Sequence, residues 1–168
     1  AAFAGCTSLE NITLPNSIKS IDSSLFKKCS SLKEIAIPDS VEIIMGYAFE
    51  GCTSLANVTL GRGVKDIWHN AFKGCTSLTS ITIPDSVTEI RERAFYGCTS
   101  LTSITIPRGV TVIKKETFSH CKALTSVTLH GGVTSIEYQA FYGCPSLTSV
   151  IIPNGLTHIA PCAFWRCT

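Results

Sequence analysis

Residues 72–95 read FKGCTSLTSITIPDSVTEIRERAF, and the rest of the chain repeats this phrase with variations. The phrase begins and ends on a phenylalanine, and the 8 phenylalanines of the 168-residue chain are spaced 23 residues apart throughout. Eight of the 9 cysteines keep the same spacing. A fixed period of this length is typical of a solenoid, in which each unit stacks on the next. The sequence therefore predicts a single array of seven 23-residue coils over residues 1–168, without an internal domain boundary.

Composition and charge limit the kinds of partner. Charged residues make up 15% of the chain and hydrophobic residues 45%, which indicates an ordered protein. The net charge of +2 argues against nucleic acid as a partner. No apolar run approaches the roughly 18–20 residues that a membrane span needs, so we expect no membrane insertion. Both ends of the chain lie within a repeat and carry no polar cap, so we expect a fragment of a longer array.

The pattern within each repeat predicts strands. We number the repeat positions from 1 to 23, as in residues 1–23. Positions 12 and 14 are Ile, Val or Leu in all seven repeats and flank a small polar or aliphatic residue, as in a half-buried β-strand. Proline at position 15 in five repeats ends that strand, because proline lacks the N–H of a sheet donor. Positions 18–21 predict a second, shorter extended segment, and stacked repeats place these segments parallel, about 4.8 Å apart.

The repeat also resembles a known family. The pattern L-x-x-I-x-I-P-x-x-V-x-x-I-x-x-x-A-F-x-x-C-x-x-L is similar to the BspA-like (Treponema pallidum-type) leucine-rich repeats, and residues 78–101 match it at every signature position. The resemblance implies a β-dominated leucine-rich-repeat solenoid with a parallel sheet on its concave face and short strand or turn segments opposite. It further implies adhesion, display at the cell surface or secretion, and a host or neighbouring-cell surface protein as partner.

The cysteine column is interpreted as buried free thiols that act as small apolar residues. Zinc binding would need paired spacings such as C-x2-C, and the sequence has none. Cys162 lies outside the column, at position 1, where the other repeats carry Ser, Tyr, Asn, Arg, Glu or Gln. We therefore predict that Cys162 is the exposed, modifiable thiol.

No catalytic pattern recurs in the sequence. Histidines 69, 120, 130 and 158 fall at four different repeat positions, which predicts neither a ladder nor a cluster. Paired carboxylates, a Ser-His-Asp arrangement and a phosphate-binding loop are not evident either. We therefore expect a protein that is not an enzyme and that uses no cofactor or metal.

Two columns of alternating charge are interpreted as structural. Position 16 reads Asp39, Arg62, Asp85, Arg108, and position 19 reads Lys19, Glu42, Lys65. Each neighbouring pair is expected to form a salt bridge between coils and so to fix their register. The strand face, rich in Ser, Asn and Thr, allows two interpretations: a polar surface for a glycan or extended peptide, or a uniform scaffold face.

The most variable positions are the candidates for partner binding. Position 22 differs in every repeat, positions 23, 1 and 4 vary almost as much, and these four positions hold all six Tyr and Trp residues. Aromatic residues and arginine are the usual anchors of interfaces. The predicted partner-binding residues are Tyr47, Trp68, Arg91, Arg93, Tyr96, Lys114, Tyr138, Tyr142 and Trp165. The alternative is drift at unconstrained exposed positions. The predicted function is non-catalytic protein–protein recognition or adhesion; the alternatives are a structural spacer or a carbohydrate-binding repeat module.

Overall fold

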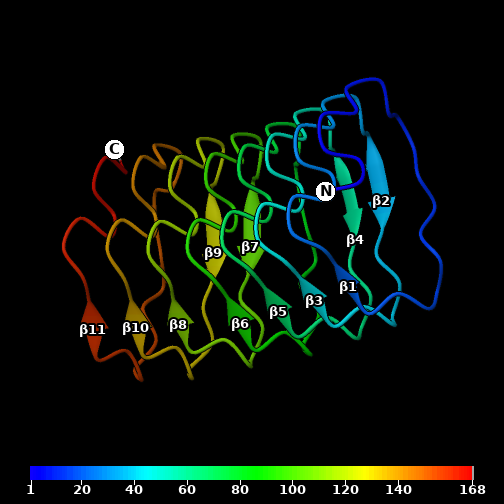
Figure 1. The fold of residues 1–168 in the computed structure, drawn as a ribbon. Helices are drawn as coiled ribbons and strands as arrows, with labels where there is room; N and C mark the ends of the chain where they lie inside the picture. Colours follow the sequence, from blue (N-terminus) through cyan, green and yellow to red (C-terminus); the bar gives the residue numbers. More distant parts are fainter. Residues whose placement is uncertain (168) are drawn as a thin grey trace.

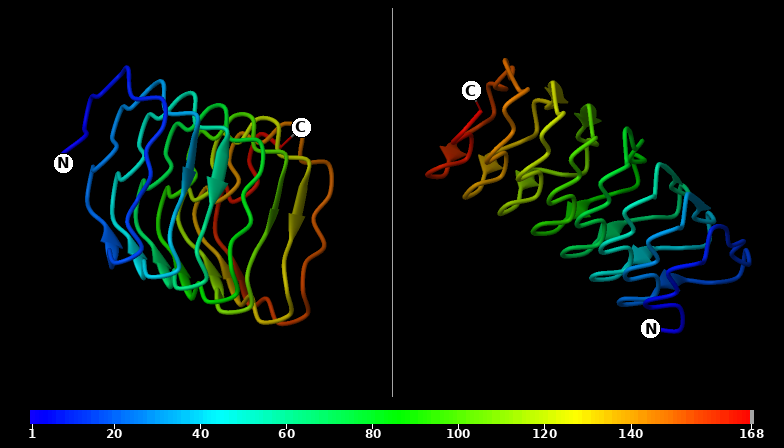
Figure 2. Two further views of the ribbon diagram at one scale, coloured as in Figure 1. Left: turned by 90° about the vertical axis from the view of Figure 1, so that its right-hand side faces the viewer. Right: turned by 90° about the horizontal axis from the view of Figure 1, so that it is seen from above.

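Each repeat forms one turn of a solenoid, and the chain ends N and C lie at opposite ends of the array (Figure 1). The computed structural model describes residues 1–167, and this part of the chain contains parallel strands and turns but no helix. The strands form two columns on opposite sides of the array (Figure 2). The first column, at repeat positions 11–13, contains β2 (Glu34–Ala36), β4 (Asn57–Thr59), β7 (Ser103–Thr105) and β9 (Ser126–Thr128). The second, at positions 20–21, contains β1 (Ser20–Ile21), β3 (Ile43–Ile44), β5 (Asp66–Ile67), β6 (Glu89–Ile90), β8 (Val112–Ile113), β10 (Ser135–Ile136) and β11 (His158–Ile159). This architecture confirms the predicted β-solenoid.

The phenylalanine column forms the centre of the core. Each ring stacks on the ring of the next coil, with centroids 5.2–5.5 Å apart and planes within 4–11° of parallel. The six inner phenylalanines, from Phe26 to Phe141, are fully buried together with the leucines at position 9 and the isoleucines at position 21 of the inner coils. The residues that repeat most faithfully are therefore the ones that hold the coils together.

The cysteine column is buried as predicted. Cys29, Cys52, Cys75, Cys98, Cys121 and Cys144 are fully buried free thiols. The prediction for Cys162 is wrong, because this thiol is only half exposed and Cys6 is the exposed one. Cys162 lies in the turn beside the core, where its backbone and the side chains around Ala163 cover it. Cys6 belongs to the first coil and has no preceding coil among the described residues to cover it.

The turn that contains the phenylalanine carries a backbone ladder along the whole array. The N–H groups at positions 1, 3 and 5 donate to carbonyls 22 residues later, in the next coil. Examples are Phe72 N–H to Ala94 O at 2.8 Å and Gly74 N–H to Tyr96 O at 2.8 Å. At position 3 the bond forms in all seven coils, from Phe3 to Phe141, at 2.8–3.1 Å. This turn, rather than either strand column, links every described coil to the next.

The turn depends on two left-handed residues per coil. Position 1 has positive φ, 54–62°, in each of Ser24, Tyr47, Asn70, Arg93, Glu116, Gln139 and Cys162, and none of these is glycine. Position 5 also has positive φ, and it is glycine in most coils but Lys28, His120 or Arg166 in three. A non-glycine residue pays about 1 kcal/mol for this conformation. The repeated bonds to the next coil compensate for that cost.

The first strand column is interrupted in a regular way. Only β2 pairs with β4 and only β7 pairs with β9, each as a two-stranded parallel ladder. In both cases the later coil lacks proline at position 15 and carries Gly61 or His130 instead. The four other successive coil pairs have proline in the later coil (Pro38, Pro84, Pro107 or Pro153) and form no ladder at these positions. The proline ring occupies the place of the N–H and holds the two backbones apart. We call these four interfaces open.

The second strand column forms a four-stranded sheet in the order β1-β3-β5-β6 and a three-stranded sheet in the order β11-β10-β8. Its strands occupy positions 20–21 of the extended segment predicted at positions 18–21. The pairing is interrupted once, between β6 and β8. Coil 4 (residues 70–92) and coil 5 (residues 93–115) are therefore joined mainly by the phenylalanine turn.

The predicted charge ladders form only in part. At position 19, Lys65 Nζ lies 2.7 Å from Glu42 Oε2, as expected. At position 16, the salt-bridge prediction is wrong: no ion pair joins these side chains within residues 1–167, and only the backbone N–H of Arg62 donates to Asp39 Oδ1, at 2.7 Å. The reason for Arg62 and Asp85 is the open interface that Pro84 creates between their coils.

Candidate interaction edge

The nine predicted partner-binding residues lie along one edge of the array, which we call the variable edge. It consists of repeat positions 22, 23, 1 and 4, between the end of the second strand and the turn around the phenylalanine. Positions 21 and 3 point into the core, so the residues between them face outward or lie across the turn. Because each coil repeats this geometry, side chains of neighbouring coils meet at a spacing of about 5 Å.

Trp68 and Arg91 form a cluster with Asp66. The indole Nε1 donates to Asp66 Oδ2 at 2.8 Å, and Arg91 Nη2 donates to the same oxygen at 2.7 Å. The guanidinium of Arg91 also lies over the Trp68 ring, 4.7 Å from its centroid. Such a cation–π contact adds about 0.5–1 kcal/mol at an exposed site. The cluster fixes both predicted residues in place and uses most of their hydrogen-bonding capacity.

Arg93 and Lys114 are also paired within the molecule. The guanidinium of Arg93 donates from Nε and Nη2 to the two carboxylate oxygens of Glu116, both at 2.9 Å. This hydrogen bonding lowers the pKa of Glu116 below its ordinary value, and burial opposes the shift. Lys114 Nζ lies 3.7 Å from Glu137 Oε1. These residues stabilise contacts between neighbouring coils before they meet any partner.

Tyr47 belongs to a small aromatic group with a histidine. Its ring meets the imidazole of His69 edge-on, with centroids 5.0 Å apart, and Lys27 Nζ lies 5.0 Å above the tyrosine ring. His69 in turn lies 6.3 Å from Trp68, with their planes 29° apart. The aromatic residues at positions 22, 23 and 1 thus lie side by side across the coils.

A second aromatic row occupies the C-terminal half of the edge. Tyr96, His120, Tyr142 and Trp165 follow one another with centroid separations of 5.3, 5.0 and 5.6 Å, each pair meeting edge to face. Cations flank the row at both ends. Lys73 Nζ lies 5.8 Å from the Tyr96 centroid, and the guanidinium of Arg166 lies 5.4 Å from the Trp165 centroid. We call these four residues the aromatic row.

Exposure distinguishes the members of the variable edge. Trp165 is 56% exposed and Tyr138 is 43% exposed, which is high for such large side chains. Lys115 Nζ lies 5.8 Å from the Tyr138 centroid. The other predicted aromatic residues are half-buried. The C-terminal half of the edge therefore offers the more accessible aromatic surface.

The sequence interpretation missed the two histidines of this edge. His69 and His120 occupy different repeat positions, so a 23-residue comparison separates them from the aromatic residues. In the turn, however, a residue contacts the residue 22 positions later, as His120 contacts Tyr142 and Tyr47 contacts His69. A search at this offset would have found both histidines. Over residues 1–167, no group of His, Cys, Asp or Glu is arranged to hold a metal ion, and no helix is long and apolar enough to cross a membrane.

Comparison with known proteins identifies the family of the chain. The model of the BspA type Leucine rich repeat region matches residues 1–67 and 47–168, in 6 copies. The chain belongs to this family. BspA-type arrays are leucine-rich repeat proteins, a group that is not typically catalytic and that consists of protein-interaction modules.

Solved structures resemble this BspA-type array closely. A leucine rich cell surface protein from Faecalibacterium prausnitzii A2-165 is 40% identical, with a TM-score of 0.86 over 92% of this chain and 44% of that one. A leucine-rich repeat protein from Bacteroides ovatus ATCC 8483 is 35% identical, with a TM-score of 0.91 over 95% of this chain and 41% of that one. The T. pallidum Leucine Rich Repeat protein is 33% identical, with a TM-score of 0.85 over 89% of this chain and 72% of that one.

The array spans less than half the length of the first two of these proteins. No curated protein matches the chain. The family and fold are thus established, and the partner and the cellular location are taken up as proposals below.

Proposed function

We propose that this BspA-type array recognises a protein on a neighbouring or host cell surface and that it acts in adhesion. The variable edge carries the proposal, because it gathers aromatic and cationic side chains along one continuous side of the solenoid. Aromatic residues and arginine supply most of the binding energy in typical interfaces. The similar protein from Faecalibacterium prausnitzii is described as a cell surface protein, which supports display at the surface.

Contacts within the edge indicate which half meets the partner. Arg91, Arg93 and Lys114 are held by carboxylates of the same array. Trp165 and Tyr138 expose more of their side chains and have cations beside them. We therefore assign the first contact with the partner to the C-terminal half, where the aromatic row lies. Binding would add small contributions from several coils rather than fill one deep pocket.

Adhesion of protein-coated beads tests the proposal. Beads that carry the array are applied to an epithelial monolayer and to a layer of bacterial cells, each with and without trypsin treatment. We expect retention on at least one untreated layer and loss of retention after trypsin. The double variant Tyr142→Ala/Trp165→Ala should reduce retention at least about tenfold, because it removes two hot-spot aromatics. The matched control Thr102→Ala/Thr125→Ala changes the strand face and should retain full binding. Retention no greater than that of albumin-coated beads would contradict the proposal.

A structural spacer is the second candidate. The observation that favours it is the unbroken hydrogen-bond ladder along the phenylalanine turn, which makes the array a continuous rod. A spacer tolerates removal of one whole 23-residue unit without loss of function, whereas a recognition array loses binding when units of the aromatic row are removed. Bead retention of a variant that lacks residues 93–115 separates the two.

A further inference from the structure

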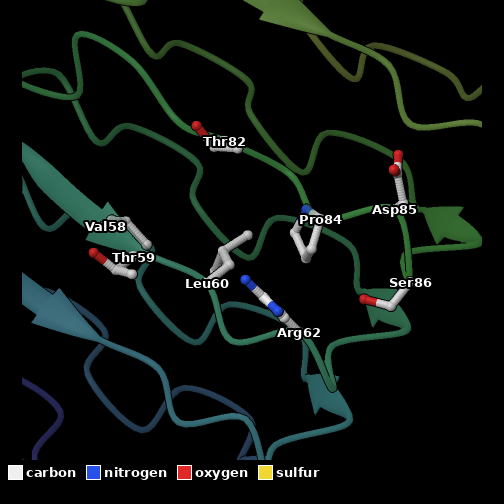
Figure 3. A pocket seen from close by; sticks show the side chains of 8 residues that line it. All are labelled: Val58, Thr59, Leu60, Arg62, Thr82, Pro84, Asp85 and Ser86. Carbon is white, nitrogen blue, oxygen red and sulfur yellow. The ribbon is translucent and has the colours of Figure 1, made fainter.

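The open interface between coil 3 (residues 47–69) and coil 4 leaves a groove on the face of the first strand column. Strand β4 pairs with β2 on one side, and residues 80–82 of the next coil form no ladder on its other side. The groove has a volume of about 590 Å³ and is shown in Figure 3. Its lining consists of Val58, Thr59, Leu60, Arg62, Thr82, Pro84, Asp85 and Ser86. The volume lies within the roughly 300–1,000 Å³ that small-molecule sites occupy.

Pro84 explains why the groove exists. Proline at this position cannot donate to the preceding coil, and its ring keeps the two backbones apart. Where the corresponding residue is Gly61, one coil earlier, the strands β2 and β4 meet and the backbone of the glycine lies against that of Pro38. The same sequence feature that breaks the sheet therefore opens a space between the coils.

The groove holds polar side chains that have no partner among the described residues. Arg62 and Asp85 form no side-chain hydrogen bond or ion pair there, although they are neighbours in the charge column. In Figure 3 the guanidinium of Arg62 extends between Leu60 and Ser86, and the carboxylate of Asp85 is turned away from it. One cation and one anion are thus left at different ends of the groove.

The threonines of the groove are also free. The hydroxyls of Thr102 and Thr125 donate to carbonyls of the preceding coil, at 3.2 and 3.0 Å. Thr59 and Thr82 make no such side-chain bond within the described chain and face each other's coil across the groove. Ser86 donates its hydroxyl to Val64 O at 2.7 Å, so its oxygen remains available as an acceptor.

We propose that this groove binds an acidic sugar of the uronic acid type. The ring carboxylate would accept two hydrogen bonds from the Arg62 guanidinium, which suits a planar carboxylate. The ring hydroxyls would bond to Thr59 and Thr82 on the two rims and to the Asp85 carboxylate at the end. The apolar face of the ring would lie on Leu60 and Pro84. Hydroxyl partners on both rims favour a sugar acid over a simple carboxylate, and the unpaired Arg62 favours an acidic sugar over a neutral one. The variable edge takes no part in this site.

Calorimetric titration of the whole protein tests the site. The probes are galacturonate, glucuronate and digalacturonate, with galactose and acetate as the neutral-sugar and plain-carboxylate references. We expect saturable binding of at least one uronate, and binding of galactose and acetate at least about tenfold weaker, since each loses one class of contact. Absence of saturable binding of all three uronates, or acetate as strong as the uronates, would overturn the proposal.

Matched variants locate the binding. Arg62→Gln should weaken uronate binding at least about tenfold, whereas Arg108→Gln, at the same repeat position two coils later, should change it less than about twofold. Equal effects of these two substitutions would overturn the assignment to this groove. If Arg62→Gln loses its native circular dichroism, the pair Thr82→Val and Thr105→Val decides. A loss of about threefold or more is then expected for Thr82→Val alone, and equal binding by both variants counts against the site.

Discussion

The sulfur of Cys75 lies 3.3 Å from the carbonyl oxygen of Phe49, and the thiol donates its hydrogen to that oxygen. The same oxygen accepts the backbone N–H of Cys52 at 3.1 Å, so it serves two coils. The thiol bond recurs in seven cysteines from Cys29 to Cys167, at 3.0–3.3 Å. The cysteine column is thus a row of hydrogen-bond donors as well as a part of the apolar core.

The thiols should differ sharply in reactivity. Burial raises the pKa of Cys52 and Cys144 to about 12 and that of Cys75 well above its ordinary value, so these thiols stay protonated and inert near pH 8. Titration of the native protein with a thiol reagent should modify Cys6 first, and then the half-exposed Cys162 and Cys167. The six inner thiols should react only in denaturant. Mass spectrometry after a short pulse identifies the sites, and rapid labelling of any inner thiol would refute the buried column.

The same pKa shifts predict a loss of stability in alkali. A thiol whose pKa is raised by folding binds its proton more tightly in the folded chain, so its contribution is complete below the ordinary pKa of 9.0 and declines above it. The decline amounts to about 1.4 kcal/mol per thiol for each pH unit above that value. Denaturant unfolding at pH 8.0 and pH 10.5 measures it. The variant Cys52→Ala should lose less stability over this interval than the parent protein, and an equal loss would count against the explanation.

Proline at position 15 should control pairing in the first strand column. Gly61→Pro should separate β2 from β4 and destabilise the protein by about 3 kcal/mol, because the backbone of Gly61 lies against Pro38. Pro84→Ala should have the opposite local effect and allow residues 80–82 to approach β4. Hydrogen exchange measures both changes: the amides of β4 should exchange faster in the first variant, and that of Leu60 slower in the second. Unchanged exchange at Leu60 in Pro84→Ala would show that the proline is not the cause of the open interface.

Strain in the turn should be measurable at Gln139. This residue has φ of 55° and makes no side-chain hydrogen bond within the described chain, so Gln139→Gly removes the strain without removing a contact. We expect a gain of about 0.5–1 kcal/mol in the free energy of unfolding. Arg93→Gly relieves the same strain but removes the bidentate contact with Glu116, so it should stabilise less or destabilise. A loss of stability in Gln139→Gly would contradict the interpretation.

Glu116 should make the stability of the array sensitive to acid. Its pKa is lowered in the folded state, chiefly by the hydrogen bonds from Arg93, so its contribution is complete above the ordinary pKa of 4.5 and is lost as the pH falls through the lowered value. Glu116→Gln should therefore destabilise the protein at pH 7 by about 1 kcal/mol and by less at pH 3. Denaturant unfolding at both values gives the difference. A cost that does not shrink in acid would place the role of Glu116 in packing instead.

Much of the fold follows from the period alone. The phenylalanine and cysteine columns, the leucines at position 9 and the isoleucines at position 21 form the core in the order in which they repeat. Their spacing requires stacking, and stacking of extended segments requires parallel pairing. The interruption of the first strand column was not predicted, because proline at position 15 was interpreted as ending a strand rather than as separating two coils.

Contacts on the variable edge were harder to predict. The residues Trp68 and Arg91 share a repeat position and were proposed together, but Asp66, which holds both, lies two positions earlier. His120 contacts residues at offsets of 22 and 24, so a comparison at 23 passes over it. A repeat specifies which residues share a column, whereas side chains of different length meet between columns. The same limit applies to Arg62 and Asp85, whose separation depends on Pro84.

The ladder along the phenylalanine turn has a direction, because every N–H at positions 1, 3 and 5 points toward the C-terminal coil. Insertion or deletion of a single residue shifts all later donors away from their acceptors, whereas a change of 23 residues restores each bond with a new partner. Changes in the length of such an array are therefore quantised. Unequal recombination between repeats can lengthen or shorten the rod in whole steps, and each step adds or removes one complete set of edge side chains.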